Sequence, residues 1–240
     1  MKESTKSIAR RIRDPRYVIR FFSGEGIDIG GKPDPLSLHR HIFPLVKSVR
    51  TWDLEDGDAQ FMSNVEDSTF DFVYSSHTLE HMRDPFIAIK NWFRILKPGG
   101  HMVLSVPDED LYEQGDFKNS FNRHHRHTFT IFKSESWSEK SINLTNLVES
   151  LGSSAQLILI NLEDTHYRYD IPKFDQTRAP LVESAIELVI RKRTSEEILE
   201  KGRIQKPQMW PDNTENHFDQ YMLDQKAAAV KYPEPFGETK

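Results

Sequence analysis

The chain has 240 residues, of which 29% are charged, with a formal net charge of −5 and no cysteine. This length allows one α/β domain with additions, and 37% hydrophobic residues are enough to form a buried core. The lack of cysteine excludes disulfides, thiolate zinc sites and thiol catalysis, which fits a cytoplasmic protein. The charge gives no sign of nucleic acid binding, and no apolar run is long enough to span a bilayer.

Residues 1–23 are predicted to form a basic helical cap, because lysines and arginines alternate there with apolar residues. The stretch lacks the apolar core of a secretory signal, and Glu3 and Asp14 disfavour a transit peptide. A solvated helix is the simpler interpretation. The functional interpretation is a lid over a ligand, or a patch that attracts an anionic acceptor.

Residues 26–33, with the sequence GIDIGGKP, read as a short buried strand that runs into a glycine turn. Gly30 and Gly31 carry no Cβ, so the backbone can turn sharply and come close to a ligand. Asp28 lies at the end of the strand, where an open α/β sheet binds its ligands. The stretch therefore indicates a nucleotide-type ligand, although neither of the common phosphate-binding glycine spacings is present.

A longer block follows at residues 70–107, containing FDFVYSSHTLEH, then DP, LKPGG and the apolar run MVLSVP. With the glycine turn, this block resembles the class I S-adenosylmethionine-dependent methyltransferases. The closest resemblance is to the small-molecule and sugar methyltransferases that carry the SSHxLEH and LKPGG elements. It extends over about residues 24–193.

The resemblance implies a Rossmann-like α/β fold with a doubly wound, mostly parallel sheet of seven strands, the last of them antiparallel. Residues 24–193 would form this methyltransferase domain, and residues 194–240 a C-terminal extension. The link from Asp53 to Asp58 is too short for a crossover helix, so either that helix is missing or the third strand is reduced. Individual strands are predicted at residues 26–29, 48–53, 72–74, 102–106, 155–160 and 185–190.

Two helices are predicted between these strands. The first begins at Asp84, which can cap the free N–H groups, with Pro85 in the first helical position. The second begins at Thr130 or Ser134 and ends at Gly152.

S-adenosylmethionine is the cofactor that the resemblance implies. Asp53 lies about twenty residues beyond the glycine turn, where an acid meets a ribose in dinucleotide-type folds. Asp58 and Ala59 resemble the element whose acid meets the adenine amino group. The predicted cofactor-binding residues are Asp28, Gly30, Gly31, Asp53, Asp58, Ala59, Ser75, Ser76, His77 and His81.

A hydroxyl acceptor needs a base, and histidine suits this role because its ordinary pKa lies near neutrality. His125 is the preferred base, because its position four residues before Phe129 resembles the HxxxF element of sugar and small-molecule methyltransferases. His124 and His77 are the other candidates. An anion-binding basic loop is an equal alternative for residues 124–127. If this segment is extended, His127 faces the same side as His125.

The predicted acceptor side is rich in polar and aromatic residues, which favours a sugar over a flat apolar acceptor. The predicted substrate-binding residues are Tyr112, Arg123, His127 and Tyr167. A divalent metal, bound by Asp108, Asp110, Glu113 and the histidines, is a less favoured alternative, because the spacing matches no fixed ligand motif.

The sequence thus predicts S-adenosylmethionine-dependent O-methylation of a sugar, nucleotide-linked or in a surface polysaccharide. An O- or N-methyltransferase of another small metabolite is the nearest alternative, and a catalytically inactive binding or scaffold protein is the second. A nicotinamide-dependent dehydrogenase is less favoured, because the glycine spacing is wrong. The expected partner is a small-molecule or glycan acceptor, and residues 194–240 would form a lid or a homodimer contact.

Overall fold

The computed structural model describes residues 2–117, 123–204 and 226–227. The chain divides into two units, residues 1–203 and 204–240, and the fold described below is that of the first. The domain boundaries proposed from the sequence, after residues 23 and 193, both fall inside this first unit. Most of the predicted C-terminal extension, residues 205–225 and 228–240, lies outside the described residues.

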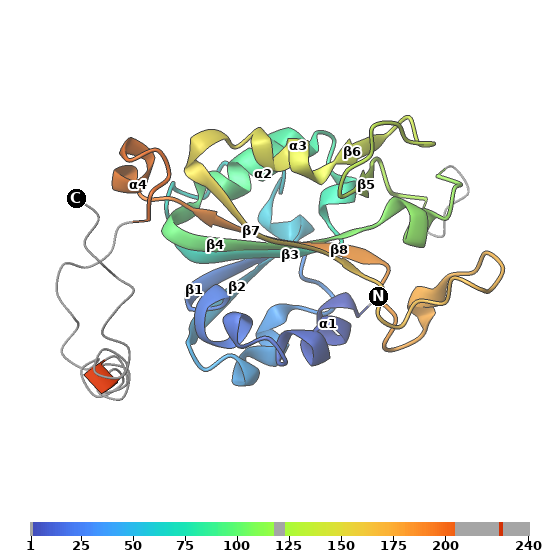
Figure 1. The fold of residues 1–240 in the computed structure, drawn as a ribbon, viewed down its shortest axis with the longest axis horizontal. Coiled ribbons are helices and arrows are strands. Elements are labelled where there is room, and N and C mark those ends of the chain that lie inside the picture. Colours follow the sequence, from blue (N-terminus) through green and yellow to red (C-terminus); the bar gives the residue numbers. More distant parts are fainter. Residues whose placement is uncertain (1, 118–122, 205–225, 228–240) are drawn as a thin grey trace. The chain divides into compact units, whose positions relative to one another are not determined.

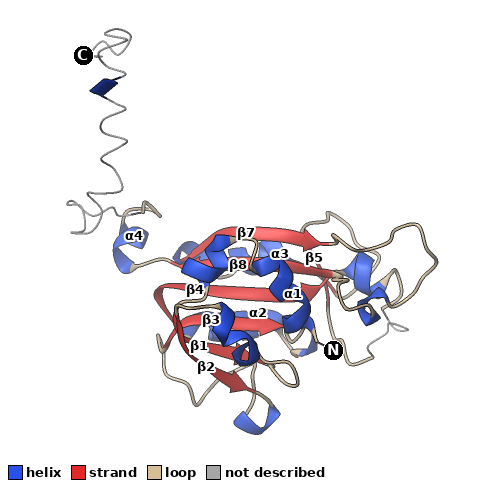
Figure 2. Ribbon diagram, turned by 90° about the horizontal axis from the view of Figure 1, so that it is seen from below, coloured by secondary structure: helices blue, strands red, loops and turns tan. Residues whose placement is uncertain are grey.

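A sheet with the strand order β2-β1-β3-β4-β8-β7 forms the centre of the first unit (Figure 2). Its strands are β1 (Gly24–Ile29), β2 (Val46–Trp52), β3 (Phe70–Ser76), β4 (Leu96–Pro107), β7 (Ala155–Glu163) and β8 (Ala185–Lys192). Strands β2, β1, β3 and β4 pair in parallel, whereas β8 runs antiparallel to both β4 and β7. The mostly parallel sheet and the antiparallel last strand are confirmed.

In the described part of the chain this sheet has six strands, whereas seven were expected. The strand that is absent is the third, between Asp53 and Phe70. Residues 57–69 form successive turns there, in which the N–H of Met62 donates to the carbonyl of Asp58 and the N–H of Val65 to that of Met62. A parallel crossover needs a dozen or more residues, and the link from β2 to Asp58 is far shorter.

Helices cover both faces of the sheet (Figure 1). Helix α1 (Glu3–Arg11) lies on one face, and helices α2 (Pro85–Arg94) and α3 (Leu144–Glu149) lie on the other. The short helix α4 (Ser195–Leu199) follows β8. The predicted start of α2 is confirmed, because the carboxylate of Asp84 accepts the N–H groups of Phe86 and Ile87.

Two segments connect the layers differently from a regular crossover. After β1 the chain forms only a short 3-10 helix, Leu36–Ile42, because Pro33 and Pro35 precede it and disfavour a regular helix. The predicted start of α3 at Thr130 or Ser134 is wrong. Short strands β5 (Thr128–Thr130) and β6 (Ser141–Asn143) pair in parallel there, with bends and turns between them, and the helix begins only at Leu144.

Two hydrophobic clusters fill the space between the layers. One joins the sheet to α2 and α3 and contains Trp92, Phe93 and Leu147. The other joins the opposite face to the N-terminal segment and contains Phe21 and Phe22. The sheet is therefore covered on both sides, which explains why its central strands read as nearly continuous apolar runs.

The N-terminal helix is present, but it is not the solvated cap that the sequence favoured. Arg11 is fully buried and forms an ion pair with Glu187 of β8, which is also fully buried. Arg10 lies 2.7 Å from Glu183 and 3.0 Å from Glu163. These pairs hold α1 against the sheet, and they place its first turn at the carboxyl end of β3, where Ser4 contacts the hydroxyl of Tyr74 at 3.0 Å.

Candidate active site

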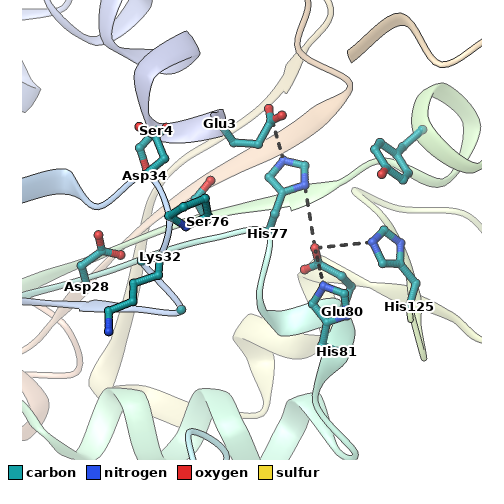
Figure 3. A pocket seen from close by; sticks show the side chains of 14 residues that line it. Glu3, Ser4, Asp28, Lys32, Asp34, Ser76, His77, Glu80, His81 and His125 are labelled. Atoms are coloured by element: carbon teal, nitrogen blue, oxygen red, sulfur yellow. Dashed lines mark ion pairs between the residues drawn. The ribbon is translucent and has the colours of Figure 1, made fainter. Parts of the chain in front are cut away.

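A cavity of about 190 Å³ opens at the carboxyl ends of β1 and β3 (Figure 3). The chain leaves β1 towards β2 on one side, and β3 lies on the other side. This is the switch point where open α/β sheets bind ligands. The cavity is lined by these predicted site residues: Asp28, Gly30, Gly31, Ser76, His77, His81, Tyr112 and His125.

The β1 end of the cavity combines a buried acid with two glycines. Asp28 is 1% exposed, and its Oδ2 accepts the N–H of Leu36 at 2.7 Å, while its Oδ1 has no hydrogen-bond partner among the described residues. Burial raises the pKa of Asp28 to about 7. A Cβ on Gly30 would lie 2.1 Å from Thr78 Oγ1, and one on Gly31 would lie 2.6 Å from Asp28 Oδ2. Only glycine therefore fits at these two positions.

The opposite wall of the cavity is built around Glu80, which is fully buried. Its Oε1 lies 3.8 Å from a ring nitrogen of His77, His81 and His125 alike. His77 also lies 4.0 Å from Glu3 of α1, so its ring stands between two carboxyl groups (Figure 3). Burial lowers the pKa of His77 to about 3 and raises that of Glu80 to about 7.

The SSHTLEH element forms this wall because of its local backbone geometry. His77 adopts a left-handed conformation with φ +52° directly after β3, and its N–H donates to the carbonyl of Ser105 at 2.9 Å. Leu79–His81 then makes one 3-10 turn. The N–H of Arg126 donates to the carbonyl of Glu80 at 2.8 Å, and this hydrogen bond holds residues 123–127 against the turn.

His125 is held by two neighbours from the segment after β4. Its Nδ1 lies 2.5 Å from Glu113 Oε1, and its ring stacks on that of Tyr112 with 5.2 Å between the centroids. His125 is 8% exposed. The imidazole is therefore fixed in orientation, with Nε2 directed at Glu80.

The predicted ribose and adenine acids lie outside the cavity. Asp53 accepts the N–H groups of Lys32 at 3.0 Å and Leu54 at 2.8 Å, and Asp58 pairs with Arg83 at 2.6 Å. Two other predicted residues make contacts within the fold. The carbonyl of Ala59 accepts the indole N–H of Trp92 at 2.8 Å, and Ser75 Oγ donates to the carbonyl of Ile29 at 2.9 Å.

The remaining predicted loop residues do not line the cavity. His124 is exposed and contributes its carbonyl oxygen, which lies 3.1 Å from His81 Nδ1. His127 donates to the carbonyl of Arg83 at 3.3 Å and lines a separate surface hollow. Arg123 is exposed, and Tyr167 packs edge-on against Tyr169.

Of the three carboxylates in the predicted metal site, Glu113 alone contacts a histidine in the described structure. Asp108 accepts the N–H groups of Asp110 and Leu111 at the start of a helical turn. Asp110 pairs with Lys133 at 2.6 Å. These two acids are therefore occupied elsewhere.

Glu80 and the α1 residues Glu3 and Ser4 also line the cavity, although none of them was predicted as a site residue. A signal for Glu80 was present, because an acid stands between His77 and His81 in the SSHTLEH element. No local signal marked Glu3, because its position depends on how α1 docks on the sheet.

A cavity at the switch point, beside a buried acid and a glycine turn, is where an open α/β sheet binds a nucleotide-type ligand. A family model described as a methyltransferase domain matches residues 12–143, which is more than half of the chain. The protein therefore belongs to this family of methyltransferase domains. No curated protein sequence matches the chain significantly.

Several solved structures resemble the fold. A methyltransferase from Archaeoglobus fulgidus shares 18% identity over 80% of this chain and 95% of its own, with a TM-score of 0.49. A Thermotoga maritima methyltransferase shares 18% identity over 80% of this chain and 100% of its own, with a TM-score of 0.41. The N-methyltransferase NodS from Bradyrhizobium japonicum shares 14% identity over 81% of this chain and 100% of its own, with a TM-score of 0.46. Similarity at this level carries no information about the acceptor.

Among the described residues, no helix has the length and apolar character that crossing a membrane would require.

Proposed function

We propose that this methyltransferase O-methylates a sugar, either nucleotide-linked or part of a surface polysaccharide. The observation that carries the proposal is a single cavity with two different ends: an acid and glycine cradle at β1, and a wall of histidine and carboxyl groups opposite. Glu3, Ser4 and Tyr112 add further hydrogen-bonding groups. Such a lining suits an acceptor with several hydroxyl groups better than a flat apolar one.

The residues at β1 fit S-adenosylmethionine. The unpaired Oδ1 of Asp28 can accept a hydrogen bond from the ammonium group of the cofactor, and the backbone at Gly30 and Gly31 can approach it closely. Asp53 and Asp58, which follow β2 and lie outside the cavity, would bind the ribose and the adenine if the cofactor extends beyond the cavity in that direction. When bound, the cofactor supplies a methyl group on a sulfonium sulfur, which an acceptor oxygen displaces in line to leave S-adenosylhomocysteine.

His77 is the residue that we assign as the general base. It lines the cavity at the end of β3, and its lowered pKa keeps the imidazole neutral, with a lone pair able to accept a proton. The imidazolium formed when it takes the hydroxyl proton would lie between Glu3 and Glu80, whose carboxyl groups would offset the low basicity that burial causes. His125, the base preferred from the sequence, lies in the same cavity. However, its ring is held by Glu113 at 2.5 Å, whereas the carboxyl groups nearest to His77 lie 3.8 and 4.0 Å away, so His77 is freer to turn towards an acceptor.

Cofactor binding is tested by calorimetric titration of the protein with S-adenosylhomocysteine. We expect a Kd in the micromolar range, about −8 kcal/mol, and at least tenfold weaker binding by Asp28→Asn. Asp14→Asn, at a half-buried acid that pairs with Arg16 away from the cavity, is the control and should bind normally. Absence of binding by the unmodified protein would contradict the enzyme assignment and favour a scaffold role.

Acceptor and base are tested by a methylation assay with nucleotide sugars, glycans and, for comparison, small amines. We expect transfer to a sugar hydroxyl, with kcat reduced at least about 100-fold in His77→Gln and an unchanged Kd for S-adenosylhomocysteine. His127→Gln, outside the cavity, is the matched control. Transfer to an amine alone would support the N-methyltransferase alternative. Normal turnover by His77→Gln would refute the assignment of the base.

A further inference from the structure

Glu80, His81 and His125 bring three ligand atoms together, all within 4.8 Å of one another. Glu80 is fully buried, and neither of its carboxylate oxygens has a hydrogen-bond partner in the described part of the chain. A buried carboxyl group without partners is costly, because nothing replaces the water that it loses. A bound ion or molecule that is not part of the polypeptide would supply the partner that this carboxylate lacks.

The hydrogen bonds on the far side of each ring determine which nitrogen faces Glu80 with a lone pair. His81 Nδ1 lies 3.1 Å from the carbonyl oxygen of His124, which can only accept, so this nitrogen carries the hydrogen. His125 Nδ1 lies 2.5 Å from the carboxylate of Glu113 and carries its hydrogen for the same reason. In the neutral form of each ring, Nε2 is then left with a free lone pair.

Both lone pairs are directed at Glu80, with each Nε2 3.8 Å from Oε1. This distance is too long for a hydrogen bond, and two lone pairs that face a carboxylate repel one another. Two ligand atoms bound about 2.1 Å from a tetrahedral ion lie about 3.4 Å apart, so a movement of a few tenths of an ångström would bring each nitrogen and Oε1 to a common cation. The two rings stand at 74° to each other with 5.0 Å between centroids, so both can approach a common ion.

We propose that Glu80, His81 and His125 bind one divalent transition-metal ion, such as zinc or manganese. Two imidazole nitrogens and one carboxylate oxygen favour such an ion over magnesium, which prefers oxygen ligands. Glu113 is a positioning residue, because it orients the His125 ring in the carboxylate–histidine–metal arrangement common around protein metals. This site differs from the one predicted from the sequence, which relied on Asp108 and Asp110.

Three protein ligands leave coordination positions open, and all three residues line the cavity beside His77. On the basis of the proposed function, the ion would bind two neighbouring hydroxyl groups of the sugar and lower the pKa of one of them. His77 would take the proton of that hydroxyl, and the hydroxyl oxygen would form a bond to the methyl carbon as the bond from that carbon to the sulfonium sulfur breaks and S-adenosylhomocysteine leaves. The site therefore selects acceptors that carry adjacent hydroxyl groups.

The test is calorimetric titration of chelator-treated protein with zinc chloride, without cofactor or acceptor. We expect one ion per chain with a micromolar or lower Kd. Binding should weaken at least about 100-fold in Glu80→Gln and in His125→Asn, and about 10- to 100-fold in Glu113→Gln. His127→Asn is the control, because that histidine lies outside the cavity, and it should bind zinc normally. Each variant is first checked for an unchanged thermal unfolding midpoint.

X-ray absorption of the zinc-loaded unmodified protein gives a second result that does not depend on any variant. Two histidine nitrogens among the ligands support the site, whereas a zinc ion bound by oxygen alone overturns it. Zinc binding that Glu80→Gln and His125→Asn leave unchanged would also overturn it. Because these measurements need no methyl transfer, a failure of the sugar assay would count against the acceptor and leave the metal site standing. Full activity after chelation would refute the role in catalysis.

Discussion

The guanidinium of Arg11 is fully buried beneath α1 and pairs with the equally buried carboxylate of Glu187. We predict that Arg11→Met lowers the free energy of unfolding by about 3 kcal/mol, because breaking a buried ion pair typically costs about 3–5 kcal/mol. Burial alone would raise the pKa of Glu187, but Arg11 and Arg10 lower it overall, so the carboxyl group stays charged. The variant therefore leaves a buried charge with fewer partners.

The lower end of that range applies because Glu187 keeps two other donors. Arg10 Nη1 remains 2.9 Å away, and the hydroxyl of Tyr17 still donates to the carboxylate. The variant also loses the hydrogen bond from Arg11 to the hydroxyl of Tyr74 and the contact with its ring, 4.9 Å from the centroid, together about 1–2 kcal/mol. Packing of the methionine side chain offsets part of this loss.

The measurement is urea unfolding at pH 7, followed by circular dichroism and tryptophan fluorescence. Arg16→Met is the control, because Arg16 pairs with Asp14 at 2.7 Å on the surface and should cost less than about 1 kcal/mol. Glu187→Gln in the Arg11→Met background should restore part of the loss, because it removes the buried charge. Equal losses in the two arginine variants would refute the reasoning.

Two further substitutions test other parts of the first unit. Gly30→Ala places a Cβ 2.1 Å from Thr78 at φ +74°, and it should weaken S-adenosylhomocysteine binding at least tenfold. Gly115→Ala is the control, because Gly115 has φ +79° and a Cβ there would have nothing within 4 Å. This control carries only the backbone strain of about 1–3 kcal/mol and should bind S-adenosylhomocysteine normally. Equal affinities in the two variants would contradict the proposal that the cofactor binds against the backbone at Gly30. Burial lowers the pKa of His101 from 6.5 to about 4. As the pH falls from 6.5 to 4, His101 therefore takes up a proton in the unfolded chain but not in the folded chain. The free energy of unfolding should decrease by up to about 3 kcal/mol over this range. In His101→Phe, the urea midpoint should change less between pH 6.5 and 4 than it does in the unmodified protein. A substitution at the exposed His41 should leave this pH dependence as it is. The same pH dependence in His101→Phe and in the unmodified protein would refute the role of His101.

The sequence by itself determined the strand and glycine turn at residues 26–31, the start of α2 at Asp84 and the methyltransferase class. These features depend on neighbours in the chain. A cap needs a donor group two or three residues away, and a glycine turn needs only its own backbone freedom. The same local reasoning located the short Asp53–Asp58 link, where the third strand is absent from the described sheet.

Only the tertiary structure decided which charged residues are buried and which histidines meet. In the sequence, Arg11 is one of several cations in a basic segment. In the folded chain it is a core residue, because Glu187, 176 residues later, lies opposite it. Likewise His125 reaches Glu80 because the loop after β4 folds back onto the SSHTLEH turn. Such contacts join elements far apart in the sequence, and their chemistry depends on burial and on ring orientation, neither of which a local pattern encodes.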